Sequence, residues 1–326
     1  MAAPPAMAGY AVNGIRCANS VINFRFLMPG LLGIFLTSCA VQGTATRAPL
    51  PSPTLPATTS QPEIVSTVPE SPTAQQITSC DEWQSWPVIP VVSTTARELY
   101  QRGQVSGNRP GAFSKIGDGE ISAEWFLTSF DLGSDHYDLG PHRNLRAVIE
   151  HFAGSFGRIG MAARRGFNTD RILDPALSDS PLCEYGETPL TCELRLHRPA
   201  FAILSLGTNQ VWTPAEFEKG MRQILDILLA KNVIPILSTK GDNLEGDHRI
   251  NRTIACLAQE YNVLLWNFWS AVQPLPNHGL QPDLEHLTYG ITDFDDLHAL
   301  QSAWTVRNLT ALQVLDAVWR GVTAPP

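Results

Sequence analysis

The chain has 326 residues, of which 23 are lysine or arginine and 31 are aspartate or glutamate, so its formal net charge is −8. An acidic chain lacks the basic excess that holds phosphate backbones, which argues against nucleic-acid binding. No apolar run reaches the length of about 18 residues that a membrane-spanning helix needs. The length allows one or two domains. The 25 prolines and 24 glycines indicate a segment of biased composition.

Residues 1–38 have the pattern of an export signal. They carry two arginines and no acidic residue, and Phe26 to Thr37 form an apolar run that suits a signal-peptide core but is too short to span a bilayer. The run ends in Leu36-Thr37-Ser38-Cys39, which resembles the lipobox of bacterial lipoproteins. The resemblance implies that Cys39 is lipidated and becomes the N-terminus. The alternatives are an uncleaved hydrophobic anchor and an ordinary secretory signal cut nearby.

Residues 39–79 are interpreted as a Pro/Ser/Thr-rich tether between that signal and a folded domain at 80–326. Between Ala45 and Ser79 there are 7 prolines and 12 serines or threonines in 35 residues. Such a segment buries too little apolar area to offset its ordering entropy, so we expect it to be disordered. These features predict an extracytoplasmic domain that is lipid-anchored to the bacterial cell membrane, or secreted if it is not lipidated.

Four cysteines lie in the predicted domain, and outside the cytoplasm they allow three disulfide pairings. Cys183 and Cys192 are close in the sequence, which favours that pair and, by elimination, Cys80 with Cys256. Four buried free thiols are the alternative. No C-x-x-C spacing occurs, so we expect no metal site on these cysteines.

From Cys80 onward, short apolar runs alternate with helical periodicity. The predicted strands are Ala112–Ile116, Ala200–Leu206, Val233–Ser238 and Val263–Phe268, and the predicted helical or amphipathic segments are Glu120–Phe130, Arg143–Phe152, Thr213–Lys231, His248–Tyr261 and Leu297–Val322. A capping box at Thr213 to Glu216 marks one helix start. This alternation predicts an α/β fold, a three-layer α/β/α sandwich with a mainly parallel sheet.

Polar and glycine-rich residues follow the predicted strands. Gly117-Asp118-Gly119-Glu120 comes after the first strand, Gly207-Thr208-Asn209-Gln210 after the second, and Asp283 and His286 stand in a loop before the last helix. Ligands bind at the carboxyl ends of strands in such sheets, so these segments predict the site.

In their order and spacing, these three segments resemble the sequence blocks of the SGNH (GDSL) hydrolases, which have a flavodoxin-like architecture. The resemblance implies that His286 is a general base oriented by Asp283, with Asp295 and His298 as a weaker alternative pair. It implies that the Asn209 amide and the Gly166 backbone donate to an oxyanion. The family's nucleophile is a serine at the position that Gly119 occupies here, and glycine cannot form an acyl-enzyme.

The resemblance implies carboxylic-ester hydrolysis of acyl groups on glycans or lipids, without a metal or organic cofactor and impaired by Gly119. A water activated by His286 is one route to remaining activity. The alternative is a non-catalytic module that binds an acylated surface glycan in the degenerate cleft. Lys240, Asp242 and His248, beyond the third strand, are further candidates for substrate binding. The expected partners are an acylated carbohydrate or lipid ester and, through Cys39, a membrane; we expect no nucleic acid and a monomer.

Overall fold

The computed structural model describes residues 79–178 and 180–324. The predicted signal peptide at 1–38, the lipidation site Cys39 and the tether up to residue 78 lie outside the described residues. Among the described residues, no helix has both the length and the apolar character needed to cross a membrane.

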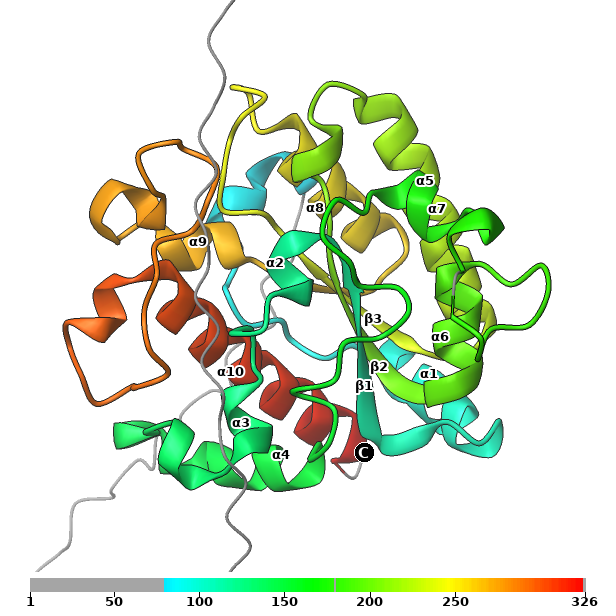
Figure 1. Cartoon of the computed structure of the whole chain (residues 1–326), viewed down its shortest axis with the longest axis horizontal. Coiled ribbons are helices and arrows are strands. Elements are labelled where there is room, and N and C mark those ends of the chain that lie inside the picture. Colours follow the sequence, from blue (N-terminus) through cyan, green and yellow to red (C-terminus); the bar gives the residue numbers. More distant parts are fainter. Residues whose placement is uncertain (1–78, 179, 325–326) are drawn as a thin grey trace, which may run out of the picture. The chain divides into compact units, whose positions relative to one another are not determined.

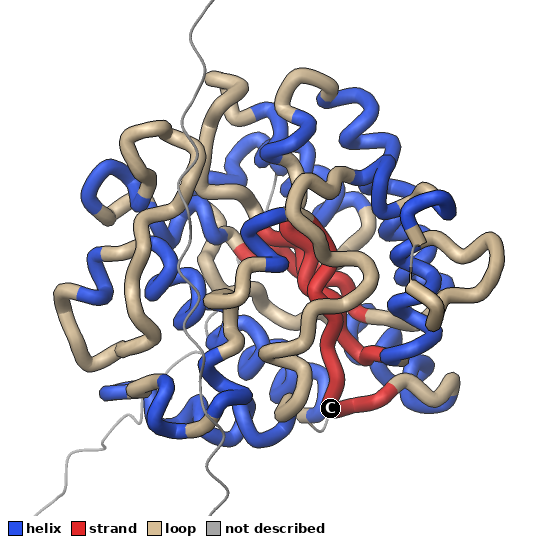
Figure 2. The backbone as a smooth tube through the Cα atoms, in the orientation of Figure 1, coloured by secondary structure: helices blue, strands red, loops and turns tan. Residues whose placement is uncertain are grey.

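The described elements alternate between helices and strands along the chain (Figures 1 and 2). The strands are β1 (Arg109–Gly117), β2 (Pro199–Ser205), β3 (Ile234–Ser238) and β4 (Leu264–Trp266). The α-helices are α1 (Thr94–Val105), α2 (Gly119–Ser122), α3 (Ser129–Leu132), α4 (Arg146–His151), α5 (Thr169–Ile172), α6 (Pro189–His197), α7 (Pro214–Ala230), α8 (Arg249–Glu260), α9 (Phe268–Val272) and α10 (Ala303–Thr323). The 3-10 helices are η1 (Cys80–Ser85), η2 (Ser134–His136), η3 (Gly140–Leu145), η4 (Pro175–Leu177), η5 (Thr208–Gln210), η6 (Pro276–Gly279) and η7 (Ala299–Gln301).

In the described part of the chain, the four strands form one parallel sheet in the order β1-β2-β3-β4. On the outer side of β1, Gly117 forms an isolated parallel bridge with Ala163, a residue between β1 and β2 in the sequence. If this short segment is counted as a strand and the five strands are numbered by their order in the sequence, their spatial order is 2-1-3-4-5. This is the flavodoxin-like order, whose ligands bind where the strand order reverses.

Two apolar cores cover the two faces of the sheet, because successive strand residues point to opposite faces. Phe201 and Ile203 of β2 pack in one core with α1, α4, α9 and α10. Ala202 and Leu204 pack in the other with η1, α6, α7 and α8. Figure 1 shows α10 on one side of the strands and α6 and α7 on the other. The three-layer α/β/α prediction is confirmed.

The outer edges of the sheet are occupied by other parts of the chain. On β1, the Phe113 amide donates to Ser155 Oγ (3.4 Å) and the Phe113 carbonyl oxygen lies 3.1 Å from His197 Nε2. β4, the strand at the opposite edge, has three residues, and the next amide, that of Asn267, donates to the Val88 carbonyl at 3.2 Å. Backbone groups of β1 therefore have partners at its outer edge, and at the other edge the chain makes such a contact directly after the short strand β4.

The helix predicted at Glu120–Phe130 is wrong after its first turn. α2 ends at Ser122, and Leu127 has a φ of 64°. The buried amide group of Asn308 in α10 accepts from the Leu127 N–H (2.9 Å) and donates to the Trp125 carbonyl (3.1 Å). A distant side chain thus takes the Leu127 amide and the Trp125 carbonyl, which in a continuing helix would pair with groups four residues away along the chain.

Two other helices differ from the prediction at their starts, one in its position and the other in its cap. The terminal helix begins at Ala303 rather than Leu297, because the amides of Ala303 and Trp304 donate to Oγ1 and the carbonyl oxygen of Thr288, at 2.9 and 3.1 Å. α7 begins at Pro214, as expected, but the side chain of Thr213 makes no capping hydrogen bond.

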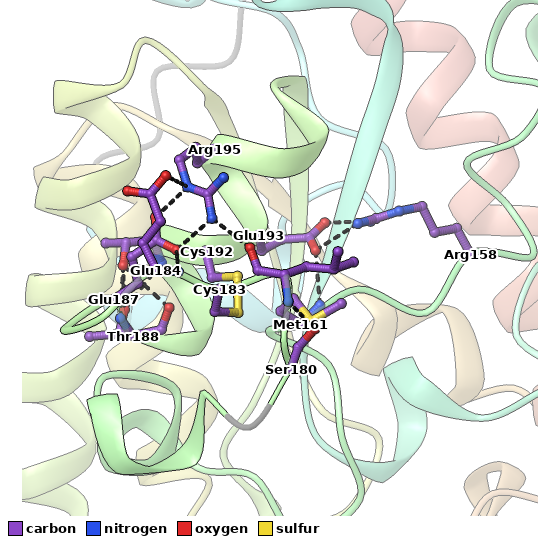
Figure 3. The surroundings of a disulfide bond; sticks show 12 residues. Arg158, Met161, Ser180, Cys183, Glu184, Glu187, Thr188, Cys192, Glu193 and Arg195 are labelled. Carbon is purple, nitrogen blue, oxygen red and sulfur yellow. Dashed lines mark hydrogen bonds and ion pairs between the residues drawn. A yellow bond between two sulfur atoms is a disulfide. The ribbon is translucent and has the colours of Figure 1, made fainter.

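The structure contains both of the disulfides that the spacing favoured. Cys80–Cys256 joins η1 to α8 across 176 positions of sequence, and Cys183–Cys192 closes a loop at the start of α6 (Figure 3). Beside the second disulfide, Glu193 is fully buried and paired with Arg158. This ion pair holds α6 against the segment that follows α4, and the disulfide ties α6 to the loop before it.

Candidate functional site

The site begins where β1 and β2 end side by side. Gly117 and Ser205 are partners in the parallel register, and the next amide, that of Asp118, donates to the Ser205 carbonyl at 3.3 Å. A Cβ on Gly117 would lie 1.9 Å from that carbonyl oxygen, and its φ is +148°. Only glycine fits there, because any side chain would collide with the neighbouring strand.

Asp118 caps the short helix α2 that follows β1. Its carboxylate accepts from the Glu120 amide at 3.2 Å, so the turn is held from within. Burial raises the pKa of Asp118 to about 7. Gly119, the first residue of α2, has open space beside it, because a Cβ atom on this residue would have only Cγ of Arg165 within 4 Å.

The predicted second oxyanion donor lies on the segment that bridges the outer edge of β1. The Gly117 amide donates to the Ala162 carbonyl and the Arg164 amide to the Gly117 carbonyl, at 2.9 and 3.1 Å. The chain then turns through Gly166, which has a φ of +78°. No described residue accepts a hydrogen bond from the Gly166 amide. The amide is therefore available to a bound oxygen.

Asn209, in the 3-10 turn after β2, is tied to the same segment. Its Nδ2 donates to the Phe167 carbonyl at 3.0 Å, which uses one of its two amide hydrogens. Arg165, which precedes Phe167 by two residues, is the residue that lies beside Gly119. The structure thus brings together Gly119, Gly166 and Asn209, three of the residues that the sequence motifs singled out.

Asp283 and His286 form a hydrogen-bonded pair. His286 Nδ1 lies 2.8 Å from Asp283 Oδ2, and Asp283 Oδ1 accepts the backbone amides of Glu285 and His286 at 3.0 Å each. The His286 side chain is 60% exposed and the Asp283 side chain 48% exposed, so the pair is open to a substrate from solution. The two backbone hydrogen bonds and the histidine side chain lower the pKa of Asp283 to about 2, and the Asp283 carboxylate raises the pKa of His286.

Electrostatic effects link this pair to the glycine-rich turn. Burial raises the pKa of Glu120, and the charge of His286 is one of those that oppose the rise. The hydrogen bond to Asp283 raises the pKa of His286, and the charge of Arg165 opposes that rise. The charge of His286 therefore interacts with those of Glu120, which follows Gly119, and of Arg165, which lies beside it. The weaker pair is arranged differently, because the amides of Asp295 and His298 donate to the carboxylates of Asp293 and Asp296.

Sequence reasoning missed an ion pair beneath the site. Glu120 Oε2 lies 3.3 Å from Nη1 of Arg307, a fully buried residue of α10. Nη2 of Arg307 donates to Ser205 Oγ at 2.8 Å. The guanidinium lies over four aromatic rings, those of Phe126, Trp266, Phe268 and Trp304. The available signal was Arg307 itself, the one charged residue between Ala299 and Leu315.

The residues predicted to bind substrate beyond β3 have internal partners instead. Lys240 is buried, and its Nζ donates to Asp242 Oδ1 and Glu245 Oε2 at 2.6 Å each. The other oxygen of Asp242 accepts from the Thr208 hydroxyl at 2.8 Å. The His248 ring packs edge-on against Trp83 and Trp269. None of these contacts supports a substrate-binding role for Lys240, Asp242 or His248.

No part of the site resembles a metal centre. Within the described residues, the one cluster with metal-ligating geometry is Cys183, Glu187 and Cys192. Both of its sulfur atoms are used in the disulfide, so they are not thiolate ligands.

Neither a protein-family model nor a curated protein matches the sequence. A solved GDSL-like lipase from Bacteroides thetaiotaomicron VPI-5482 is 13% identical, with a TM-score of 0.39, over 68% of this chain and 97% of the lipase. An acetyl xylan esterase is 15% identical, with a TM-score of 0.40, over 62% and 97%. The esterase EstA from Pseudoalteromonas is 13% identical, with a TM-score of 0.36, over 54% and 87%. These values are low, so the site assignments rest on this chain's own residues.

Proposed function

We propose that the domain is a hydrolase of the SGNH (GDSL) type that cleaves carboxylic esters with water in place of the usual serine. The hydrogen bond between His286 Nδ1 and Asp283 Oδ2 is the observation that carries this proposal. This hydrogen bond occupies Nδ1 of the His286 ring and leaves Nε2 to accept a proton, which is the arrangement a general base needs.

In the proposed reaction, a water molecule lies in the space beside Gly119 and gives a proton to Nε2 of His286. The resulting hydroxide adds to the ester carbonyl carbon, and the oxyanion accepts hydrogen bonds from the Gly166 amide and Asn209 Nδ2. When the intermediate collapses, the C–O bond to the alcohol breaks and His286 returns the proton to the leaving oxygen. The products are a carboxylic acid and an alcohol, and no covalent enzyme intermediate forms.

The rate should be low, because a bound water replaces an activated hydroxyl group. Serine hydrolases that lack triad members keep about 10³–10⁴-fold catalysis over water through their oxyanion donors and substrate binding. We expect activity of that order here.

The test is hydrolysis of 4-nitrophenyl acetate by the purified full-length chain, compared with His286→Ala and with His298→Ala as a matched control. Loss of at least tenfold in the first variant only supports the proposal. Hydrolysis at the buffer rate by the unaltered chain, or equal rates in all three proteins, contradicts it.

A second function is favoured by one observation, the missing hydroxyl at Gly119. In this alternative, the same cleft binds an acylated surface glycan without cleaving it. Binding of an acylated oligosaccharide by a chain that shows no esterase activity would support it.

The location of the domain is also a proposal and rests on the sequence alone. The apolar run and lipobox-like segment that end at Cys39 support export and lipid attachment to a bacterial membrane. A substrate outside the cytoplasm, an acylated glycan or a lipid ester, follows from that location. Mass spectrometry of the membrane fraction tests it, since an acylated Cys39 at the N-terminus is expected and an unmodified, secreted chain would exclude the anchor.

A further inference from the structure

Two exposed aromatic side chains meet beside the candidate catalytic pair. Trp125 is 41% exposed and Tyr289 66% exposed, and their ring centroids lie 5.6 Å apart in an edge-to-face arrangement. An edge-to-face contact covers a face of only one of its two rings. The exposure of large aromatic side chains to water is unfavourable, so two of them in contact on the surface indicate a candidate binding site.

The backbone around Trp125 is held rigidly. Phe126 and Leu127, the next two residues, are fully buried. Asn308 receives the Leu127 amide and donates to the carbonyl of Trp125 itself, at 2.9 and 3.1 Å. The Trp125 ring also rests edge-on against the buried ring of Trp304, 5.7 Å away. The exposure of Trp125 is therefore built into the fold rather than the result of a loose loop.

Tyr289 is held in the same way on both sides. Before it, the Thr288 amide and hydroxyl donate to the Gly279 carbonyl at 2.8 and 3.0 Å. After it, Gly290 packs so closely that an added Cβ would lie 2.3 Å from Thr305 Oγ1. The tyrosine ring, between two fixed neighbours, still points largely into solvent.

Both residues are within short reach of the site. Tyr289 follows His286 by three residues, so their Cα atoms are at most about 11 Å apart. Trp125 follows the end of α2 by the same number of residues, and α2 begins at Gly119. Tyr289 is therefore close along the chain to His286, and Trp125 to the turn that carries Gly119.

We propose that Trp125 and Tyr289 form an aromatic platform that binds the pyranose ring of an acylated carbohydrate and presents its ester to His286. The C–H bonds on one side of a sugar ring carry partial positive charge and are attracted to the negative face of an aromatic ring. Because both backbones are already fixed, binding orders little that was mobile, which favours affinity. This inference rests on the proposed function and names its substrate class.

A lipid surface is the competing occupant of exposed apolar side chains. The chain carries a net charge of −8, which opposes attraction to an anionic membrane. The platform consists of two rings fixed at an angle, which suits a rigid ring better than a flexible acyl chain. The observations therefore favour the carbohydrate.

The experiment measures binding of an acetylated xylo-oligosaccharide to the full-length chain by isothermal titration calorimetry. The variants are Trp125→Ala and Tyr289→Ala, and Tyr185→Ala is the control because Tyr185 is a fully exposed aromatic residue within the Cys183–Cys192 loop. We expect about tenfold weaker binding in each platform variant and no change in the control. Circular dichroism establishes whether the variants are folded. If Trp125→Ala does not fold, Tyr289→Ala, which removes a mostly exposed ring, tests the platform alone.

A second measurement separates this inference from the proposed function. Hydrolysis of ethyl acetate, an ester without a ring, is measured in the unaltered chain and in His286→Ala, and it reports on the proposed reaction independently of the platform. Unchanged oligosaccharide binding in both platform variants overturns the platform even if ethyl acetate is hydrolysed. Ring-dependent binding to phosphatidylglycerol vesicles, without oligosaccharide binding, also overturns it. Oligosaccharide binding that depends on both rings supports it even if no ester is cleaved, in which case only the proposed hydrolysis fails.

Discussion

The position that a Cβ atom would take on Gly119 lies 3.8 Å from Cγ of Arg165, an ordinary van der Waals distance. The φ of Gly119 also lies outside the left-handed region. A small side chain is therefore accommodated at this position without moving the backbone, although the sequence has none there.

From this space we predict that Gly119→Ser increases ester hydrolysis by about 10²-fold, because a serine hydroxyl activated by His286 is a better nucleophile than a bound water. Steady-state rates on 4-nitrophenyl acetate measure the change, and mass spectrometry detects the acyl-enzyme. Gly119→Ala fills the same space without a hydroxyl and is the matched control. Equal rates in the serine and alanine variants would show that a side chain here does not face the substrate.

We predict that Asp283 sets the pH dependence of the reaction. A general base acts only in its neutral form, and the Asp283 carboxylate raises the pKa of His286. Activity should therefore rise with pH through a midpoint above about 6.5, the ordinary pKa of histidine. In Asp283→Asn the midpoint should move to lower pH, while the plateau falls by about 10²-fold or more. A pH profile of kcat/KM tests this, and an unshifted midpoint would remove Asp283 from its orienting role.

We predict that Glu120 neutralises the buried charge of Arg307. Glu120→Gln leaves a fully buried guanidinium without its counter-ion and should cost about 3–5 kcal/mol in the free energy of unfolding. Adding Arg307→Met to that variant should recover most of the loss, because the guanidinium that Glu120 neutralised is then also absent. Urea denaturation of the single and double variants measures both effects. Additive losses in the double variant would mean that the two residues do not stabilise the fold as a pair.

We predict that the two disulfides differ in their contribution to stability. Cys80–Cys256 spans 176 positions and Cys183–Cys192 spans 9. In the chain-entropy account, the longer loop contributes about 5 kcal/mol and the shorter about 2.5 kcal/mol, because cross-linking distant residues restricts the unfolded chain more. Urea midpoints of the two double cysteine-to-serine variants compare them. A larger loss from the short loop would contradict the prediction.

Strands such as β2 were predictable because they are apolar on both faces. The run Ala200–Leu206 became β2 at Pro199–Ser205, with each boundary displaced by one residue. The helix predicted to Phe130 ends early, and the Leu127 amide pairs instead with Asn308, 181 positions further along the chain. Local periodicity contains no information about such a partner.

The same contrast applies to the candidate site. The Asp283–His286 pair is three residues apart and local, so spacing alone suggests it. Glu120 and Arg307 are far apart in the sequence, so their pairing becomes visible only after folding. Lys240 and Asp242 looked like ligand-binding charges because sequence does not reveal that they neutralise each other.

The covered margins of the sheet affect how the molecules behave when they are crowded. Exposed strand edges are templates on which sheets of separate molecules join and aggregate. Here the side chains of Ser155 and His197 contact backbone groups of β1. At the other edge, β4 is short and is followed by the hydrogen bond from the Asn267 amide to the Val88 carbonyl. Strand-to-strand joining between copies is therefore disfavoured at both margins, and we expect the domain to tolerate high local concentration without forming sheet-linked assemblies.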